Sequence, residues 1–401
     1  MLNSDLKPFY AVIPLSLEEL FVKELKALGI EKCRAEKGGC WFGSTMEDMM
    51  KVNLQTRVAT RILLKLKEAP YKTEEDIYQF AKGIDWESYF GIKDSFKVQL
   101  SAHRCPLRSL DFLTLKVKDA VADHFNDLYS ERPNVDRQYP KIKIFVFVNE
   151  TKCTLYLDTS GESLFKRGWR EQKGEAPLKE NLAAGLLGLA DWTPDKPLYD
   201  PFCGSGTIVI EAATIAANMA PGLYRRFGFE HFKGFNSDRW QQIKKEARMA
   251  VDFSKQVTLS GSDISTLIVD RAEKNARLAG LGKWLDEGKL QFFARDARQA
   301  APSTDAGGLI ITNPPYGEQS NPKSATVPAL MSNFAEALKK NFAGWTVWML
   351  TSDRRLPRQM RLKENRKIVI FNGSIECRLF RFEMVSGSFR KEPTHQNLPK
   401  E

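Results

Sequence analysis

Apolar and polar positions along the first part of the chain follow two periods, and each period predicts a different element. A helix over 16–28 gathers its leucines and Phe21 on one face, because they recur every three or four residues. Alternating runs predict strands at 9–14, 31–37, 40–43 and 58–66, and a second helix is expected over 45–55. The order β-α-β-β-α-β predicts a ferredoxin-like α+β domain over 1–66.

The segment 67–160 repeats this mixture and predicts a second α+β domain. Its expected elements are helices near 73–82 and 109–129 and strands at 95–102, 141–148 and 153–158. A polar stretch over 161–176 follows, and we interpret it as a linker between domains.

From 177 to 385, apolar strands alternate with amphipathic helices, which is typical of an α/β domain with a mainly parallel sheet. Strands are expected at 198–200, 257–263, 290–297, 308–312, 345–350, 366–371 and 375–383. The helices expected among them begin or lie at 178–190, 207–219, 238, 265–279, 326–341 and 354–363. The tail 386–401 is predicted to be disordered.

The first candidate binding loop is Asp200-Pro201-Phe202-Cys203-Gly204-Ser205-Gly206-Thr207, between an apolar strand and an Ala-rich helix. Gly204 and Gly206 allow the backbone to approach a ligand where a Cβ would collide. Unpaired N–H groups at the start of the helix favour an anion. An ordinary glycine turn of an α/β fold is the competing interpretation. Cys203 is interpreted as a small residue that fills the turn, because no histidine lies near it in sequence.

The second candidate loop, Asn313-Pro314-Pro315-Tyr316, also follows an apolar strand. Its prolines fix the backbone and extend the residue before them, so the Asn313 side-chain oxygen and the Pro314 carbonyl are held outward as acceptors beside the Tyr316 ring. Two acceptors and a ring suit a planar base with an exocyclic amino group, although a proline turn would have the same sequence. Both loops follow strands of one α/β segment, where ligands bind in such folds, and together they predict a site for two substrates.

Asp263 ends the strand 257–263, where an acid can accept both ribose hydroxyls of a nucleoside. A cap for the helix 265–279 competes with this role, since Asp also caps helices well. The aromatic stretch 221–238 either bounds a target pocket or seals itself onto the domain.

Composition narrows the class of partner. The 401 residues carry a net charge of +10, which suits a polyanion, although a solvated basic surface has the same composition. Six cysteines without a C-x-x-C pair, and only four histidines, argue against a zinc site. The sequence has no signal peptide and no long apolar run, so we expect a cytoplasmic protein with reduced thiols and no membrane partner.

The two loops together resemble those of class I S-adenosylmethionine-dependent methyltransferases that methylate amino groups. With 174–184, 218–223 and the long front half, the chain resembles THUMP-domain RNA methyltransferases that make N2-methylguanosine, above all the family that acts on bacterial large-subunit ribosomal RNA. The resemblance implies a Rossmann-like seven-stranded methyltransferase domain over 177–385 with an antiparallel last strand. It also implies an RNA-binding THUMP domain over 67–160, S-adenosylmethionine as cofactor, an RNA partner, no metal and a monomer.

The resemblance also implies roles for individual residues. Asn313, Pro314 and Tyr316 would be catalytic, and Pro315 and Tyr316 would hold the target base. Asp200 would face the sulfonium and Asp296 would accept from the adenine amino group. The further cofactor-binding residues implied are Phe202, Gly204, Gly206, Thr207, Asp263, Asn313 and Pro177. The basic residues Arg104, Lys116 and Lys118 could meet RNA phosphates, or could belong to an ordinary charged surface.

Several activities share these loops. DNA adenine and glutamine methylation use similar Asn-Pro-Pro-Tyr loops, but neither group usually carries a THUMP-like front half. A tRNA guanosine N2-methyltransferase would have all the same parts. An RNA-binding ribosome assembly factor with a silent cofactor site is disfavoured by the intact acids at 200, 263 and 296.

Overall fold

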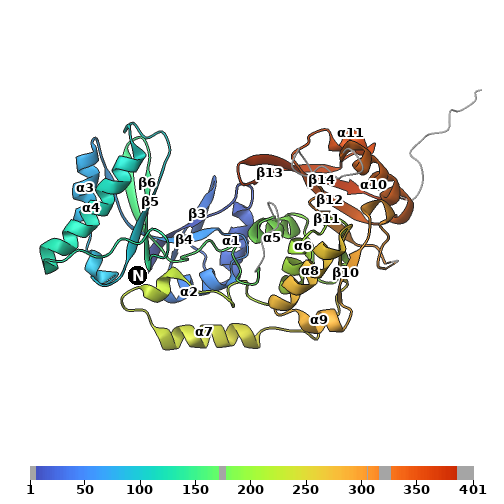
Figure 1. The fold of residues 1–401 in the computed structure, drawn as a ribbon, viewed down its shortest axis with the longest axis horizontal. Coiled ribbons are helices and arrows are strands. Elements are labelled where there is room, and N and C mark those ends of the chain that lie inside the picture. Colours follow the sequence, from blue (N-terminus) through green and yellow to red (C-terminus); the bar gives the residue numbers. More distant parts are fainter. Residues whose placement is uncertain (1–5, 171–177, 305, 316–326, 386–401) are drawn as a thin grey trace, which may run out of the picture.

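The computed structural model describes residues 6–170, 178–304, 306–315 and 327–385, and Figure 1 shows three parts in a row. The first and second parts share one seven-stranded sheet with the strand order β2-β3-β1-β4-β7-β6-β5. Its strands are β1 (Lys7–Val12), β2 (Cys33–Glu36), β3 (Gly39–Ser44), β4 (Arg61–Pro70), β5 (Phe96–Ala102), β6 (Ile142–Val148) and β7 (Lys152–Asp158). Its helices are α1 (Glu18–Ala27), α2 (Met46–Gln55), α3 (Glu74–Lys82) and α4 (Leu110–Tyr129).

The first four strands and two helices have the ferredoxin-like arrangement that the sequence predicts. β1 lies between β3 and β4 and is antiparallel to both. Alternate residues of β1 and β3, such as Phe9, Ala11 and Phe42, are buried, and Phe42 meets Phe21 of α1 edge to face. One face of this sheet is therefore covered by helices, because that is where the apolar positions of the strands point.

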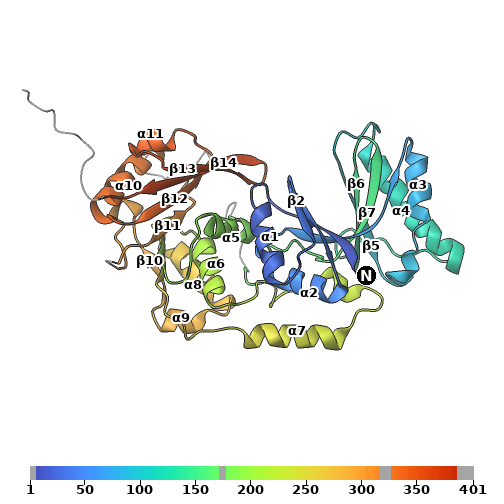
Figure 2. The same ribbon diagram turned by 180° about the vertical axis from the view of Figure 1, so that it is seen from behind.

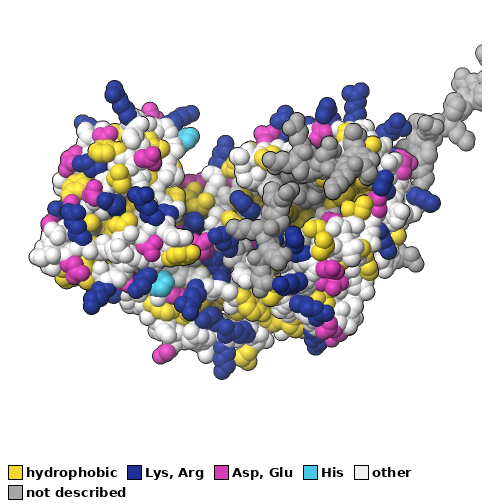
Figure 3. All heavy atoms as spheres, viewed as in Figure 1, with side chains coloured by type: hydrophobic (Ala, Val, Ile, Leu, Met, Phe, Trp, Pro, Cys, Tyr) yellow, Lys and Arg dark blue, Asp and Glu magenta, His cyan; other side chains and the backbone are white. Residues whose placement is uncertain are grey.

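Strand β4 joins the ferredoxin-like part to the THUMP-like part. Arg61–Leu64 of β4 pair with β1, and Leu63–Pro70 pair with β7, with a register shift between Lys65 and Lys67. The expected division at 66/67 thus falls inside a strand, and the two parts share a continuous sheet. Figure 3 shows a notch in the surface between the lobe that contains α3 and α4 and the rest of the molecule.

The third part is built on a second seven-stranded sheet with the order β10-β9-β8-β11-β12-β14-β13. Its strands are β8 (Leu198–Asp200), β9 (Leu259–Asp263), β10 (Leu290–Ala294), β11 (Leu309–Thr312), β12 (Thr346–Thr351), β13 (Arg366–Asn372) and β14 (Ile375–Glu383). β14 runs antiparallel to β12, whereas β8 to β12 are mutually parallel, so the predicted sheet with its antiparallel last strand is confirmed.

Helices α5 (Glu180–Leu189), α6 (Thr207–Ala216), α8 (Thr266–Leu278), α10 (Val327–Asn341) and α11 (Leu356–Met360) accompany this sheet. A one-turn helix, α9 (Gly282–Asp286), was not expected, because five residues are too few to show a helical period. Among the described helices, none is both long and apolar enough to cross a bilayer.

The aromatic stretch 221–238 and helix α7 (Ser237–Met249) connect the third part to the front half. Figures 1 and 2 show α7 running beneath the other elements. Phe227 and Phe229 are buried and pack edge to face on Trp240 of α7, while the Lys233 N–H donates to the Tyr89 carbonyl across the interface. The stretch therefore seals itself onto the molecule, which is the second of the two interpretations that the sequence allowed.

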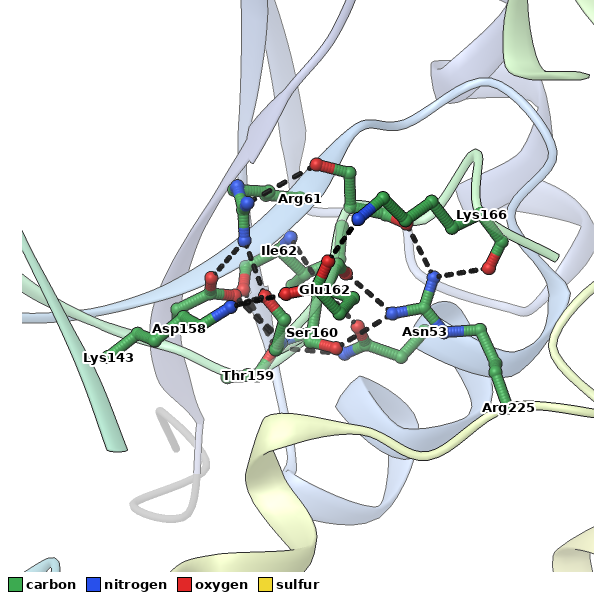
Figure 4. A network of polar contacts seen from close by, with 12 residues as sticks. Asn53, Arg61, Ile62, Lys143, Asp158, Thr159, Ser160, Glu162, Lys166 and Arg225 are labelled. Carbon is green, nitrogen blue, oxygen red and sulfur yellow. Dashed lines mark hydrogen bonds and ion pairs between the residues drawn. The ribbon is translucent and has the colours of Figure 1, made fainter. Parts of the chain in front are cut away.

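Arg225 fixes the linker by donating to backbone carbonyls (Figure 4). Its Nη1 donates to Ser163 and Lys166 and its Nη2 to Ser160 and Glu162. An arginine with four carbonyl partners is a structural brace, so it is not available to bind RNA.

A buried charged cluster completes the contact between the front half and the second sheet. The Arg167 guanidinium lies 3.1 Å from the Glu211 carboxylate of α6 and also donates to the Arg57 carbonyl at 2.6 Å. Arg57 in turn donates to the Met219 carbonyl at 2.6 Å and to Thr214. Breaking one partner of such a pair would leave an uncompensated charge, so the cluster holds the parts in one arrangement.

Candidate active site

The two predicted loops meet at the carboxyl ends of neighbouring strands. β8 and β11 are parallel neighbours, with Leu198 in register with Leu309. Beyond the paired residues, the Thr312 hydroxyl donates to Asp200 Oδ1 at 2.6 Å. Asn313 therefore follows a residue bonded to the start of the glycine loop, and the two loops share one edge of the sheet.

Asp200 is an almost fully buried carboxyl group with a raised pKa. It is only 2% exposed, and burial raises its pKa from 3.8 to about 7, against the opposing effect of hydrogen bonds from Thr312 and the Phe202 N–H. The neighbouring charge of Asp263 raises it further. A carboxylate in this position gains from a nearby positive charge, because burial makes its own charge costly.

The glycine loop is shaped by backbone conformation and by close packing. Gly204 and Gly206 have φ of +52° and +86°, in the left-handed region that favours glycine. A Cβ built on Gly204 would meet no heavy atom within 4 Å, so the loop leaves open space there. Gly261 of β9 was not predicted as a site residue, but a Cβ there would lie 2.8 Å from the Cβ of Cys203. Burial raises the pKa of the Cys203 thiol, which fits a residue that fills the turn.

Arg170 of the linker, which the sequence did not single out, holds the glycine loop from outside. Its Nη1 and Nη2 donate to the hydroxyls of Ser205 and Thr207, both at 2.7 Å, and its Nε donates to Glu180 at 2.8 Å. Burial raises the pKa of Glu180, while Arg170 opposes that effect. The guanidinium also lies 5.0 Å from the centre of the Trp169 ring. One arginine thus joins the linker, α5 and the loop.

The two further acids lie at the ends of the next strands. Asp263 Oδ1 accepts from the Ser265 N–H at 3.0 Å, a turn contact that leaves Oδ2 without a hydrogen bond in the described part of the chain. Asp296 follows β10 and accepts from the Arg298 guanidinium, which lowers the pKa of its carboxyl. Both acids lie on the same edge of the sheet as Asp200, since β8, β9 and β10 are consecutive parallel neighbours.

Within the described ranges, three buried side-chain atoms have no hydrogen-bond partner, in Asn181, Trp240 and Asn313, and Asn313 is the one that lies in a predicted binding loop. Its Oδ1 is buried and has no hydrogen-bond partner among the described residues. Buried polar atoms are nearly always satisfied, so an orphaned acceptor points to a donor supplied from elsewhere. Pro314 is buried and Pro315 half-buried beside it, and Phe202 packs edge to face on Phe334 at 5.1 Å. Tyr316 and Pro177 lie outside the described residues.

The three predicted phosphate contacts lie around β5 and α4, in the part built on the first sheet, whereas the two loops lie at the edge of the second sheet. The Arg104 side chain is exposed and therefore accessible to a partner. Its backbone lies in the left-handed region, with φ of +54°. Lys116 instead pairs with Glu75 at 3.2 Å, and Lys118 pairs with Asp119. Figure 3 shows Lys and Arg side chains spread over the lobe of α3 and α4 and along the lower edge, rather than in one compact patch.

The arrangement fits a nucleoside cofactor with a positive centre. Asp200 supplies a buried negative charge, Asp263 has one carboxylate oxygen free for hydroxyl groups, and Gly204 leaves space against the backbone. In the described ranges, no three His, Cys, Asp or Glu side chains are grouped so that they could hold a metal ion.

Comparison with known families assigns all three parts. The profile of the RMKL-like methyltransferase domain matches residues 167–381, that of the THUMP domain matches 71–158, and that of the RlmL ferredoxin-like domain matches 8–63. The chain is 36% identical over 390 residues to "Ribosomal RNA large subunit methyltransferase K/L" of Shewanella amazonensis, covering 96% of this chain and 54% of that protein. It therefore spans about half the length of the curated relatives it matches.

Two solved structures resemble nearly the whole chain. SMU.472, crystallised in complex with SAH, has a TM-score of 0.84 at 30% identity, covering 96% of this chain and 100% of that one. A protein from Clostridium difficile 630, described as a possible methylase, has a TM-score of 0.84 at 31% identity with the same coverage.

Proposed function

Because the chain belongs to the family of RMKL-like methyltransferase domains, we propose that it transfers a methyl group from S-adenosylmethionine to the N2 amino group of a guanosine in ribosomal RNA. The curated relatives carry the ribosomal substrate in their names, and the THUMP match favours RNA over DNA or protein. In this proposal the segments 1–66 and 67–160 bind the RNA, and 177–385 carries out the reaction. The protein acts in the cytoplasm as a monomer.

The observation that carries the proposal is the orphaned Oδ1 of Asn313, one residue beyond the hydrogen bond between Thr312 and Asp200. An amino group has two hydrogens to donate, and Asn313 Oδ1 and the Pro314 carbonyl are two acceptors on adjacent residues. Accepting both hydrogens turns the nitrogen lone pair away from the loop, which is the orientation that an amine needs to act as a nucleophile. The target base must leave any helix to reach this loop.

When bound, the cofactor would supply a methyl group on a sulfonium: the C–S bond breaks as the amine nitrogen bonds the methyl carbon, a neutral thioether leaves without the help of a metal, and the methylated nitrogen then releases a proton to solvent. The residues that hold it are Asp200 toward the positive centre, Asp263 at the ribose hydroxyls and Asp296 at the adenine amino group. Gly204 and Gly206 let the backbone approach, and the proposal also assigns cofactor contacts to Phe202, Thr207 and Pro177. Tyr316 and Pro315 hold the target base. Asn313 faces both ligands, because it lies where the two loops meet.

Methyl transfer to defined RNAs tests this proposal. Unmodified 23S ribosomal RNA and tRNA transcripts are incubated with the protein and isotope-labelled S-adenosylmethionine, and the nucleosides are identified by mass spectrometry. We expect label in N2-methylguanosine of the 23S transcript. Label in tRNA alone would support the tRNA alternative, and label in N6-methyladenosine would overturn the assignment to guanine.

Asn313→Ala tests the acceptor role in the same assay. We expect transfer to be lost while cofactor affinity stays near that of the unaltered protein. Asn341→Ala is the matched control, since Asn341 lies in the same domain and its side-chain amide donates to the Ala300 carbonyl, away from the two loops. Single-turnover transfer by Asn313→Ala at more than about a tenth of the normal rate would refute the role, since loss of the orientation of the nucleophile should lower the rate by much more than about tenfold.

A further inference from the structure

The face of the ferredoxin-like sheet opposite α1 and α2, which no described helix covers, carries aromatic and cationic side chains in register. Arg34 of β2 pairs with Trp41 of β3, and Trp41 pairs with Tyr10 of β1. Residues directly opposite one another on neighbouring strands point to the same face, so these three side chains form one row. Phe9 and Phe42, their chain neighbours, point the other way and are buried.

A shallow, open depression of about 500 Å³ lies next to this row. Its lining includes Lys7, Pro8, Lys32, Arg34, Trp41 and Gly43. A Cβ built on Gly43 would meet no heavy atom within 4 Å, so the backbone there is open to a ligand. Three of the lining residues are cations and none is an acid. Arg34 Nη2 lies 3.8 Å from a carboxylate oxygen of Glu36, which is not a lining residue. The Arg34 side chain is 78% exposed, so this pair leaves it available.

The Trp41 ring is held in place on the side of the sheet toward β1, β4 and β7. The Tyr10 ring lies 4.6 Å from it, the Lys65 ammonium 5.0 Å, and the Tyr156 ring 6.3 Å. Tyr10 itself occupies the space above Gly39, where a Cβ would lie 2.1 Å from the tyrosine hydroxyl. A ring fixed in this way stacks on a ligand with little loss of side-chain freedom.

We propose that this depression binds an unpaired nucleotide of the RNA substrate, with the base stacked on Trp41 and the adjacent phosphates held by Lys32 and Arg34. The inference rests on the proposed function for the identity of the partner. Its chemistry favours a single strand, because a base within a helix cannot stack on a side chain, whereas an unpaired base offers both a ring and flanking phosphates. The site lies on a different sheet from the Asn313 loop, so it anchors the RNA at a point remote from the base that is methylated.

Binding of a fluorescent five-nucleotide single-stranded RNA, measured by anisotropy without any methyl donor, tests the site. Trp41→Ala should bind at least about fivefold more weakly, the lower end for loss of one base–aromatic stack, and Trp41→Phe should recover most of the affinity. Arg34→Glu and Lys32→Glu should also weaken binding and should reduce the salt dependence by about one counterion each. Lys26→Glu is the matched control, since Lys26 is exposed on the helix-covered side of the same domain.

The two charge reversals are on exposed side chains, so the test remains decisive if Trp41→Ala fails to fold. Unchanged affinity in Arg34→Glu and Lys32→Glu, or an equal loss in Lys26→Glu, would overturn the site. If Trp41→Ala lost as much affinity for a duplex RNA of the same length as for the single strand, the single-strand assignment would be overturned. The binding assay contains no methyl donor, so its result is independent of methyl transfer. If the methylation assay failed while affinity for RNA still depended on Trp41, the proposed activity would be refuted and this site would remain supported.

Discussion

Replacing Asp200 by Asn should stabilise the protein at neutral and alkaline pH while weakening cofactor binding. The Asn side chain has the same shape and can still accept from Thr312 and from the Phe202 N–H. It removes the cost of keeping a charged carboxylate in a site that is 2% exposed.

The size of the effect follows from the pKa of Asp200. The folded value of about 7 lies above the ordinary value of 3.8, so the folded protein holds this proton more tightly than the unfolded chain does. The associated stability is present below pH 3.8 and is lost as the pH rises through 7. A difference of about three pKa units corresponds to roughly 4 kcal/mol in total.

Equilibrium unfolding in urea without cofactor, at several values between pH 5 and pH 8, measures this effect. The stability of Asp200→Asn relative to the unaltered protein should increase by roughly 2–3 kcal/mol over that range. Asp270→Asn, an exposed carboxylate in α8 of the same domain, is the control and should show no such trend. Parallel pH profiles for the Asp200 variant and the unaltered protein would refute the reasoning, as would a lower stability of the variant at pH 8.

Further predictions concern the same site and its supports. A positive cofactor should lower the pKa of Asp200, so calorimetry should find affinity rising from pH 5 to 7, with proton release, and Asp200→Asn should abolish this dependence. Asp263→Ala should weaken cofactor binding by about 1.5–3 kcal/mol, and calorimetry that finds no change would refute its ribose contact. Arg170→Met should raise the KM for cofactor more than it lowers kcat, with partial recovery in Arg170→Lys; unchanged kinetics would mean that the loop holds its shape alone. Arg225→Ala should speed tryptic cleavage of the linker, since carbonyls there lose their donors, and an unchanged cleavage pattern would contradict the bracing role.

Local sequence was sufficient for the elements and for the two loops. Glycines at 204 and 206 and prolines at 314 and 315 restrict the backbone wherever they occur, and the apolar runs before them already identify strands. The acids at 263 and 296 could be placed at strand ends for the same reason. Their hydrogen-bond partners could not, because the Ser265 N–H reaches Asp263 and the Arg298 guanidinium reaches Asp296 only once the turns have formed.

Apart from the one-turn helix α9, the sequence by itself thus determined the order of helices and strands, the glycine loop and the rigid loop after β11, because each depends on residues within a few positions of one another. The tertiary structure alone decided that β4 belongs to both front parts, that Arg170 and Arg225 brace the linker, and that Trp41, Tyr10 and Arg34 share a face. Those relations depend on strand register and on contacts between segments distant in sequence, and no local period encodes which strands become neighbours.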